Sequence, residues 1–460
     1  MQVTHDSHQS YYERLKLLFL GSAFFAIIAS YTIIKELKDS LFISIVGSKT
    51  YVPVAKFGIL FALIPIVLIY GKLVDKMRRY QLLCLFSFIY SIIGFMCAAV
   101  VSYYGIGSEN ISQSKFYWIF GWVYFFYIET FSPFVVSIFW AFLNSVTSPD
   151  GAKKSYGFLI SCSKLGGMFT AGTAWFLLAH NKHFVGLQFT ETNIHLVLMI
   201  ASSTLLLAVP VIITMMMKYV PGRYLHGYEA SYQFEKQQSK SGKDETGMWS
   251  GLSYLIKYPY AFGIFCSYFF YEIISAVLSY MRLGVAQEVS CDVSGVSCFL
   301  FKLVFFTHFL GLVISVFGTR IIYSRLDERL SLMIMPVVMG SLLLYLAFTS
   351  SPSALIAAFV GLRSIYYAFN QPVTEALYIP TVKTMKFKTK SWIDTFGRKM
   401  ARATGSGFNI FAATAAGGAL TGPLYIGFFG SIIVLWVFVS YFLGNKFHHA
   451  VKRGEVIGSE

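Results

Sequence analysis

The stretch Val373-Thr-Glu-Ala-Leu-Tyr-Ile-Pro-Thr381 is followed, four residues later, by Lys386-Phe-Lys-Thr-Lys-Ser-Trp-Ile-Asp394. These residues connect two long hydrophobic stretches through a short loop rich in lysine, and further basic residues follow Asp394 within the second stretch. A charged side chain at the centre of a bilayer costs about 3 kcal/mol on insertion scales. Charges of this density are therefore too costly to be incidental, and we expect the region to bind something anionic.

The amino-acid composition indicates a membrane protein. Of the 460 residues, 56% are apolar and only 13% are charged, which lies outside the range of ordinary soluble domains. A membrane-spanning helix needs roughly 20 predominantly apolar residues. We expect about twelve such spans, at 15–37, 52–72, 81–104, 116–143, 156–179, 193–217, 258–282, 300–323, 331–349, 353–377, 392–419 and 422–443. The sequence therefore predicts an all-α polytopic membrane protein.

The net charge of the chain is +15, and its basic residues are distributed unevenly between the loops expected on the two sides of the membrane. If the N-terminus is cytoplasmic, the tails and the loops after even-numbered spans hold most of the Lys and Arg, as in residues 72–79 and 383–390. This asymmetry follows the positive-inside rule and predicts that both termini are cytoplasmic. Because the charge follows membrane side, the partner that we expect is the lipid bilayer and not a nucleic acid.

A charged segment divides the expected spans into two sets. Residues 219–257 form the longest polar stretch, so we predict a six-helix bundle at 1–218, a cytoplasmic linker, and a second six-helix bundle at 258–460. The halves echo each other: Lys154-Ser-Tyr156 opens the fifth span as Lys390-Ser-Trp392 opens the eleventh. Many secondary transporters are built from such repeats, with the substrate site between them. The loop after the second span, Gly71-Lys-Leu-Val-Asp-Lys-Met-Arg-Arg79, also resembles that of the major facilitator superfamily.

The sequence offers little for metal, cofactor or enzyme chemistry. Histidines and cysteines do not cluster with metal-ligand spacing, and neither a Gly-x-x-x-x-Gly-Lys-Ser/Thr phosphate loop nor a His-x-x-x-x-Asp dyad is present. We therefore expect no metal, no cofactor and no catalytic residues. Cys291 and Cys298 lie in a loop predicted to face outward. They either form a disulfide, if that compartment is oxidising, or remain two free thiols.

Charged residues inside the expected spans carry the functional argument. The basic ones outnumber the acidic ones, which suits a multiply charged anion because guanidinium groups bind phosphate oxygens bidentately. The basic set is Lys35, Lys38, Lys56, Lys164, Arg282, Arg363, Arg398, Lys399 and Arg402, and the acidic set is Glu36, Asp39, Glu129, Glu272, Glu375 and Asp394.

Two structural interpretations compete with a transport role for these charges. In the first, pairs such as Asp394 and Arg398, at i,i+4, only stabilise a helix. In the second, basic residues near span ends, such as Lys38 and Arg282, extend their charged groups to the interface. Lys164, Glu129 and Glu272 lie deeper in their expected spans, so we interpret them as pathway residues.

Several motifs resemble the non-mitochondrial ATP/ADP translocases, the nucleotide transporters of obligate intracellular bacteria and plastids. They are Lys38-Asp-Ser-Leu41, Phe139-Trp-Ala-Phe-Leu-Asn144, Tyr271-Glu272 and the stretch from Glu375 to Asp394, of which the last is the most specific. The resemblance covers nearly the whole chain. It implies a twelve-helix, major facilitator-like fold that exchanges ATP for ADP and phosphate, or carries other nucleotides. It places family functional charges on Lys38, Glu129, Glu272 and Lys390.

The sequence departs from this family pattern at informative positions. Family members that exchange ATP usually carry an acidic residue after the position of Asn144 and a lysine before that of Glu375, where this chain has Ser145 and Thr374. Another nucleotide, NAD, a sugar phosphate or a different organic anion therefore remains open as the substrate. The start of the eleventh span, Arg398-Lys-Met-Ala-Arg-Ala-Thr-Gly405, is altered as well.

Together these features predict a secondary transporter that works by alternating access between its halves. Basic residues would neutralise phosphates while Glu129 and Glu272 pair with them in the empty site, and a ligand shifts a conformational equilibrium only by its differential affinity for the two states. In a proton symporter either glutamate would carry the proton, since burial favours the neutral carboxyl group. The candidate substrate-binding residues are Lys38, Glu129, Asn144, Lys164, Glu272, Lys390, Asp394, Arg398 and Arg402.

The expected setting follows from the resemblance and from the charge distribution. We expect a monomer in the inner membrane of an intracellular bacterium, or in a plastid-type envelope. A membrane transferase is the alternative of a different class, and the absence of its motifs argues against it.

Overall fold

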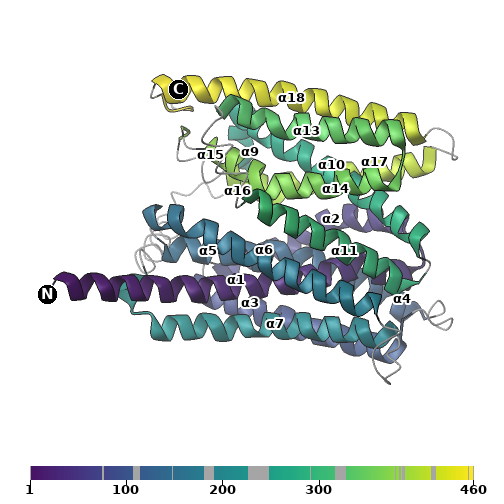
Figure 1. Ribbon diagram of the computed structural model, residues 1–460, viewed down its shortest axis with the longest axis horizontal. Coiled ribbons are helices and arrows are strands. Elements are labelled where there is room, and N and C mark those ends of the chain that lie inside the picture. Colours follow the sequence, from purple (N-terminus) through teal and green to yellow (C-terminus); the bar gives the residue numbers. More distant parts are fainter. Residues whose placement is uncertain are drawn as a thin grey trace. The chain divides into compact units, whose positions relative to one another are not determined.

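The computed structural model is helical almost throughout the part of the chain that it describes (Figure 1). The described residues are 2–74, 77–106, 114–147, 149–180, 191–225, 248–290, 292–315, 328–378, 380–382, 385, 389–415, 421–453 and 455–458. Contacts divide the chain into two compact units.

The first unit comprises residues 1–48, 61–244 and 289–308. Its helix α1 packs against α4, α6 and α7, and α3 packs against α7. A stacked pair of rings, Phe24 on α1 and Phe139 on α5, lies 4.6 Å apart between centroids in the interior. The helices are α1 (Gln2–Val46), α3 (Arg79–Tyr104), α4 (Lys115–Phe131), α5 (Ser137–Val146), α6 (Pro149–Ala179) and α7 (Glu191–Tyr219), followed by a 3-10 turn, η3 (Gly222–Tyr224).

The second unit comprises residues 49–60, 245–288 and 309–460. Its helix α13 packs against both α14 and α18. The helices are α9 (Met248–Lys257), α10 (Pro259–Val289), α13 (Glu328–Thr349), α14 (Pro352–Ile365), α15 (Gln371–Ala376), α16 (Lys390–Trp392), α17 (Arg398–Ala415) and α18 (Thr421–Arg453). Two further helices, α2 (Tyr51–Val74) and α11 (Val293–Val313), contribute residues to both units. The division at 218 and 258 stays a prediction.

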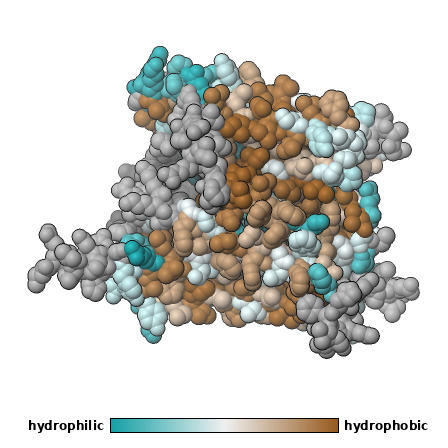
Figure 2. All heavy atoms as spheres, viewed as in Figure 1, coloured by the Kyte–Doolittle hydropathy of each residue, from teal (hydrophilic) through white to brown (hydrophobic). Residues whose placement is uncertain are grey.

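Within the described residues, nine helices are long and apolar enough to cross a membrane. The three other expected spans coincide with α2, α6 and α17. Helix α17 is not apolar enough to count among the nine, because Arg398, Lys399 and Arg402 lie in its first five residues. On the face shown in Figure 2, hydrophobic side chains cover much of the described surface. Large apolar side chains such as Phe348, which is 86% exposed, suit a lipid environment.

In the described chain, three π-helical segments interrupt longer helices. They are η2 (Ser132–Val136) between α4 and α5, η5 (Tyr366–Asn370) between α14 and α15, and η7 (Ile393–Gly397) between α16 and α17. Pro133 lies in η2, and Pro372 is the second residue of α15, which begins directly after η5; neither can donate a backbone N–H to the helix. A π segment inserts an extra residue, changes the direction of the side chains that follow, and is frequent at functional sites.

Helix α1 extends beyond the end that we predicted at residue 37, and continues to Val46. The motif Lys38-Asp-Ser-Leu41 therefore lies inside the helix, not after it. The prediction was wrong because we interpreted the charges as the end of a span. Lys38 and Asp39 are instead buried, at 3% and 4% exposure, and Lys38 pairs with carboxylates.

The chain's last described residues return to the loop that follows α15. Thr381 and Ile457 form an isolated parallel bridge. The Ile457 amide donates to the Pro380 carbonyl at 2.7 Å, and the Val382 amide donates to the Ile457 carbonyl at 3.1 Å. Gly458 follows with φ +93°, a backbone conformation that favours glycine. The tail is thus attached to the segment that follows the Tyr-Ile-Pro motif.

Candidate functional site

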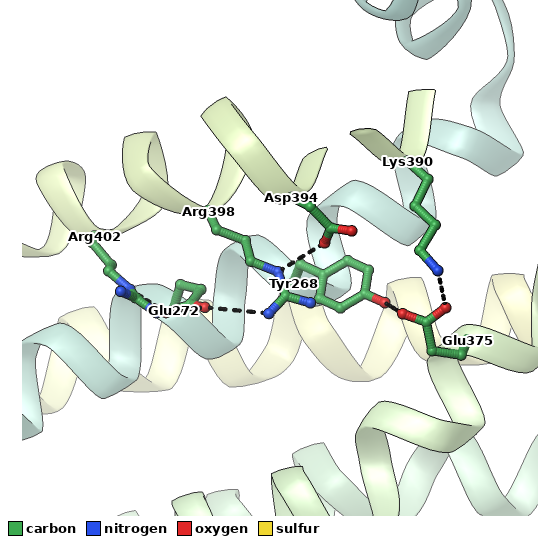
Figure 3. A network of polar contacts seen from close by, with 7 residues as sticks. All are labelled: Tyr268, Glu272, Glu375, Lys390, Asp394, Arg398 and Arg402. Atoms are coloured by element: carbon green, nitrogen blue, oxygen red, sulfur yellow. Dashed lines mark hydrogen bonds and ion pairs between the residues drawn. The ribbon is translucent and has the colours of Figure 1, made fainter. Parts of the chain in front are cut away.

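A buried glutamate on α10 lies at the centre of a charge network in the second unit (Figure 3). Arg402 on α17 binds Glu272 through two nitrogens: Nε lies 2.7 Å from Oε2, and Nη2 lies 3.2 Å from Oε1. The Glu272 side chain is only 2% exposed. Paired geometry of this kind is the strong, directional form of a charge-assisted hydrogen bond.

Arg398, one turn before Arg402 on α17, joins this pair to further groups. Its Nη1 lies 3.9 Å from Glu272 Oε1, and its Nε lies 3.2 Å from Asp394 Oδ1. Its guanidinium also lies 4.4 Å from the centre of the Tyr268 ring. One arginine therefore contacts two carboxylates and an aromatic face, as Figure 3 shows.

The network continues from Tyr268 to Lys390. The Tyr268 hydroxyl donates to Glu375 Oε1 at 3.3 Å, and Lys390 forms an ion pair with Glu375 Oε2. Both side chains of that ion pair are 34% exposed, close to the 42% of Asp394 and the 38% of Arg402. Among the seven residues in Figure 3, three basic and three acidic side chains balance. We call this set the Glu272 cluster: Tyr268, Glu272, Glu375, Lys390, Asp394, Arg398 and Arg402.

The local backbone explains how α17 presents its arginines to α10. Gly405, less than a turn after Arg402, lies so close to α10 that a Cβ there would be 2.9 Å from the Ile273 carbonyl oxygen. The absence of a side chain allows the two backbones to approach. Segment η7 lies immediately before Arg398 and sets the direction of the arginines relative to Asp394.

A smaller network surrounds Glu129 in the first unit. Lys38 Nζ on α1 lies 2.5 Å from Glu129 Oε1 on α4 and 3.3 Å from Asp39 Oδ1. The same ammonium group lies 4.1 Å from the centre of the Phe125 ring. Glu129 precedes the π segment η2 by three residues. These four residues, Lys38, Asp39, Phe125 and Glu129, are called the Glu129 cluster.

The structure brings most of the predicted site residues together in these two sets. Lys38 and Glu129 meet in one unit, and Glu272, Lys390, Asp394, Arg398 and Arg402 meet in the other. Lys164 lies buried on α6, with 9% exposure. Asn144 lies in α5, but its side chain is outside the described part of the chain. The predicted Cys291–Cys298 disulfide also falls outside it, because Cys291 is not among the described residues.

Sequence reasoning left Asp39, Glu375 and Tyr268 out of the proposed site. Asp39 and Glu375 were visible as intramembrane acids, but nothing in the sequence pairs Glu375 with Lys390 across the intervening loop. Tyr268 lies one helical turn before Glu272, a spacing that places both on one face of α10. That spacing is the signal that could have identified it.

Arg282 corrects a further expectation. One of the two structural interpretations placed its charged group at the membrane interface, but Arg282 is 2% exposed and packs 4.5 Å from the centre of the Phe359 ring. Burial against an aromatic face takes the place of interfacial water. As for metals, no group of three or more His, Cys, Asp or Glu that could hold an ion occurs among the described residues.

The arrangement of the two clusters is suited to displacement by an anion. Buried ion pairs gain little net stability, because desolvation offsets most of the attraction between the charges. A phosphate group can replace a carboxylate on an arginine with similar bidentate geometry. The Glu272 cluster is therefore able to exchange its internal carboxylate contacts for contacts with a multiply charged anion.

Comparison with solved structures shows which fold this chain adopts. The D-xylose–proton symporter matches with a TM-score of 0.59 at 13% identity, over 93% of this chain and 96% of that chain. The E. coli fucose:proton symporter FucP matches with a TM-score of 0.58 at 14% identity, over 95% and 99% of the two chains. These likenesses show that the fold is that of a major facilitator transporter, as the sequence predicted.

The chain belongs to the TLC ATP/ADP transporter family, whose model matches residues 9–447. The ADP,ATP carrier protein 5 of Rickettsia prowazekii (strain Madrid E) is 20% identical over 435 residues, 85% of each chain. That of Rickettsia typhi (strain ATCC VR-144 / Wilmington) is 21% identical over 436 residues, again 85% of each chain. The protein is thus a multi-pass membrane transporter and not an enzyme, and the resemblance in its motifs is confirmed.

Proposed function

We propose that this transporter exchanges nucleotides, with ATP and ADP as the first candidates. The observation that carries the proposal is the Glu272 cluster, in which Arg398 and Arg402 contact carboxylates that a phosphate chain can replace. Support comes from the family and from the carriers of ADP and ATP among its relatives. Nucleotide exchange accounts for both observations, because a nucleotide carries several negative charges and needs several cations at its binding site.

The proposed mechanism is alternating access between the halves 1–218 and 258–460. Phosphate groups bind Arg398 and Arg402 and release Glu272 from its ion pairs. Lys38, whose partner is Glu129, and the buried Lys164 contribute further positive charge. Substrate binding therefore replaces internal ion pairs, and this replacement couples occupancy to the conformational equilibrium. Asn144, Lys390 and Asp394 complete the proposed site.

A different phosphate-bearing substrate is the second candidate. Thr374 is 1% exposed, and its hydroxyl donates to the Asn370 carbonyl at 2.9 Å. By the family resemblance, ATP exchangers usually carry a lysine at this position. A buried hydroxyl bound to its own helix offers no charge to a phosphate, so another nucleotide, NAD or a sugar phosphate is favoured by this residue. A proton-coupled mechanism would use Glu129 or Glu272 as the proton carrier.

The proposed setting is the inner membrane of an intracellular bacterium. The curated relatives come from Rickettsia species, and the loop charges favour a cytoplasmic position for both termini. We propose a monomeric transporter, since each six-helix half supplies its own charge cluster.

The first experiment is uptake of radiolabelled ATP into intact bacteria that express this chain. Unlabelled ADP, NAD, other nucleoside triphosphates and a protonophore are added in turn. Uptake that ADP inhibits and the protonophore leaves intact supports exchange. Absence of ATP uptake under every condition contradicts the ATP assignment, and labelled NAD and sugar phosphates are then tested in the same cells.

Lys164→Gln tests whether the buried lysine on α6 acts on the substrate. We expect this change to abolish uptake of the phosphate-bearing substrate at unchanged membrane levels, because a buried cation is lost from the pathway. Arg453→Gln is the matched control, since Arg453 is 69% exposed on the last helix. Normal uptake by the Lys164 variant would exclude Lys164 from the pathway.

A further inference from the structure

Three tyrosines in the second unit have Arg398 as a common neighbour. The Tyr268 ring lies 4.4 Å from the guanidinium carbon of Arg398, and its hydroxyl donates to Glu375 (Figure 3). The other two are Tyr366 in η5 and Tyr378, which follows α15. Arg398 is among the charged groups that act on the hydroxyls of both. The three tyrosines therefore come from separate segments and share one arginine.

The hydroxyls of Tyr366 and Tyr378 differ from that of Tyr268 in their hydrogen bonding. Within the described part of the chain, both hydroxyls are buried and neither has a hydrogen-bond partner. The two residues are 0% and 6% exposed. Most buried polar groups in proteins are hydrogen-bonded, because a group that loses its bonds to water on burial destabilises the fold when it stays unpaired. Two such hydroxyls beside one charge cluster indicate a ligand that they bind.

The charged neighbours of the two hydroxyls place them at different points of the Glu272 cluster. Arg398 and Glu272 act on the Tyr366 hydroxyl. Arg398 and Glu375 act on the Tyr378 hydroxyl. An anion that binds Arg398 therefore has one of these hydroxyls towards each of the two glutamates that it would displace.

Local structure fixes the positions of both side chains. The Tyr366 ring stacks on that of Tyr271, with 3.3 Å between ring centres and 5° between planes. Tyr378 lies in a turn, where its amide donates to the Glu375 carbonyl at 3.2 Å. Side chains that are already ordered lose little further conformational entropy when a ligand binds. The two hydroxyls are thus oriented before a substrate arrives.

We propose that Tyr366 and Tyr378 bind the substrate directly, each by donating its hydroxyl hydrogen to a phosphate oxygen. A terminal phosphate offers three acceptor oxygens, so one remains for a hydroxyl after two have bound an arginine, whereas a carboxylate has only two. Because these hydrogen bonds form only in the loaded site, their full strength favours the substrate over the internal carboxylates. This inference rests on the proposed function for its substrate class and adds two binding residues to the site.

Phenylalanine variants test the proposal, because they remove only the hydroxyl. Tyr366→Phe keeps the ring that stacks on Tyr271, and Tyr378→Phe keeps the ring whose centre lies 5.5 Å from Lys390 Nζ. Each change deletes a buried hydroxyl that lacks a partner, so we expect the thermal unfolding midpoint of the purified full-length protein without ligand to stay constant or rise. Loss of binding in these variants would then have a cause other than misfolding.

The binding measurement is the rise of the unfolding midpoint as pyrophosphate is added, since a ligand that binds the folded state stabilises it. In each variant we expect the pyrophosphate concentration needed for a given rise to increase about tenfold, as loss of a hydrogen bond to a charged group predicts. No rise in the wild type, or a wild-type response in both variants, would overturn the proposal.

Tyr117→Phe is the matched control in the first unit. Tyr117 is fully buried, and its hydroxyl donates to the Gly105 carbonyl at 3.0 Å. Because this change leaves a carbonyl without its partner, we expect it to lower the midpoint without ligand. Its response to pyrophosphate should match that of the wild type. The control therefore has the opposite pattern to that of the two site variants.

A transport measurement in reconstituted vesicles identifies the source of the phosphate. If the nucleotide supplies it, Tyr366→Phe raises the KM for a nucleoside triphosphate about tenfold and changes kcat less. If free inorganic phosphate binds instead, the variant impairs uptake of labelled phosphate while the nucleotide KM stays constant. Unchanged KM values for both substrates overturn the proposal.

The proposed function and the role of the hydroxyls can fail separately. A wild type that takes up no nucleotide, but whose response to pyrophosphate depends on Tyr366, contradicts the nucleotide assignment alone. A wild type that exchanges ATP for ADP, with unchanged exchange and binding in both phenylalanine variants, contradicts only the role of Tyr366 and Tyr378.

Discussion

The Glu129 cluster and the Glu272 cluster follow one pattern with different amounts of charge. In each, a base from another helix holds a carboxylate, an aromatic ring lies under a cation, and a π segment follows or precedes within a few residues. The Glu129 cluster has one lysine and two carboxylates. The Glu272 cluster has two arginines and a lysine against three carboxylates.

This difference suggests a division of labour between the two units. Arginine grips phosphate bidentately, whereas lysine acts as a point charge. Under the proposed function, the second unit would bind and orient the phosphate chain, and the first unit would contribute charge through Lys38. Two clusters of similar geometry, of which one holds more basic side chains, would suit a polyanionic substrate.

Removal of the bidentate arginine should have the largest effect. Arg402→Gln removes the bidentate partner of Glu272, whose side chain is 2% exposed, and leaves the 3.9 Å contact from Arg398 in place; loss of the partner of a buried charge costs about 3 kcal/mol. We expect uptake to fall at least about a hundredfold, which matches that free energy. Measurement of kcat/KM in reconstituted vesicles checks this, with Arg453→Gln as control. A fall below threefold would show that Arg402 has only a structural role.

Loss of the single lysine in the Glu129 cluster should come next. Lys38→Gln leaves Glu129 and Asp39 without that cation, and we expect uptake to fall about thirtyfold, since a buried carboxylate pair loses its charge balance. Lys38→Arg keeps the charge and should recover most of the loss. If the arginine variant is as inactive as the glutamine variant, charge alone does not explain the role of Lys38.

The smallest effect is expected at the ion pair between Lys390 and Glu375, in which both partners are partly exposed. Lys390→Gln removes an ion pair whose two side chains are each 34% exposed, and exposed pairs contribute only a few tenths of a kcal/mol to about 1 kcal/mol. We expect uptake to fall about threefold, with weaker salt dependence than in the wild type. A loss as large as that of Arg402→Gln would instead place Lys390 in direct contact with substrate.

The fold was accessible from the sequence because its signal is local. Long apolar stretches, loop charges and motifs such as Tyr271-Glu272 predicted the helical membrane fold and the family. The ends of the helices were less accessible. Charge alone suggested that the first span ends before Lys38. The structure places Lys38 inside a helix, where Glu129 neutralises its charge. The π segments were invisible for the same reason, since they depend on tertiary packing around particular residues.

The candidate site was only partly accessible from the sequence. The pair of Asp394 and Arg398 follows from helical spacing and is present at 3.2 Å. The pair of Glu272 and Arg402 joins residues 130 positions apart, so no local pattern identifies it. The sequence left the surroundings of Arg282 open, because it shows the depth of a residue in a span but not the ring that covers it.

Ile457 in the tail is hydrogen-bonded to the loop at Pro380–Val382. This contact makes Ile457 a suitable position for a fluorescent label on the transporter. A fluorophore on a cysteine introduced at Ile457 is attached to the segment that begins the path to Lys390, yet it lies outside both charge clusters. Its emission would report movement of that loop during turnover, without a label in the substrate route. A label at Ile457 would therefore measure the rates of conformational steps in the transport cycle.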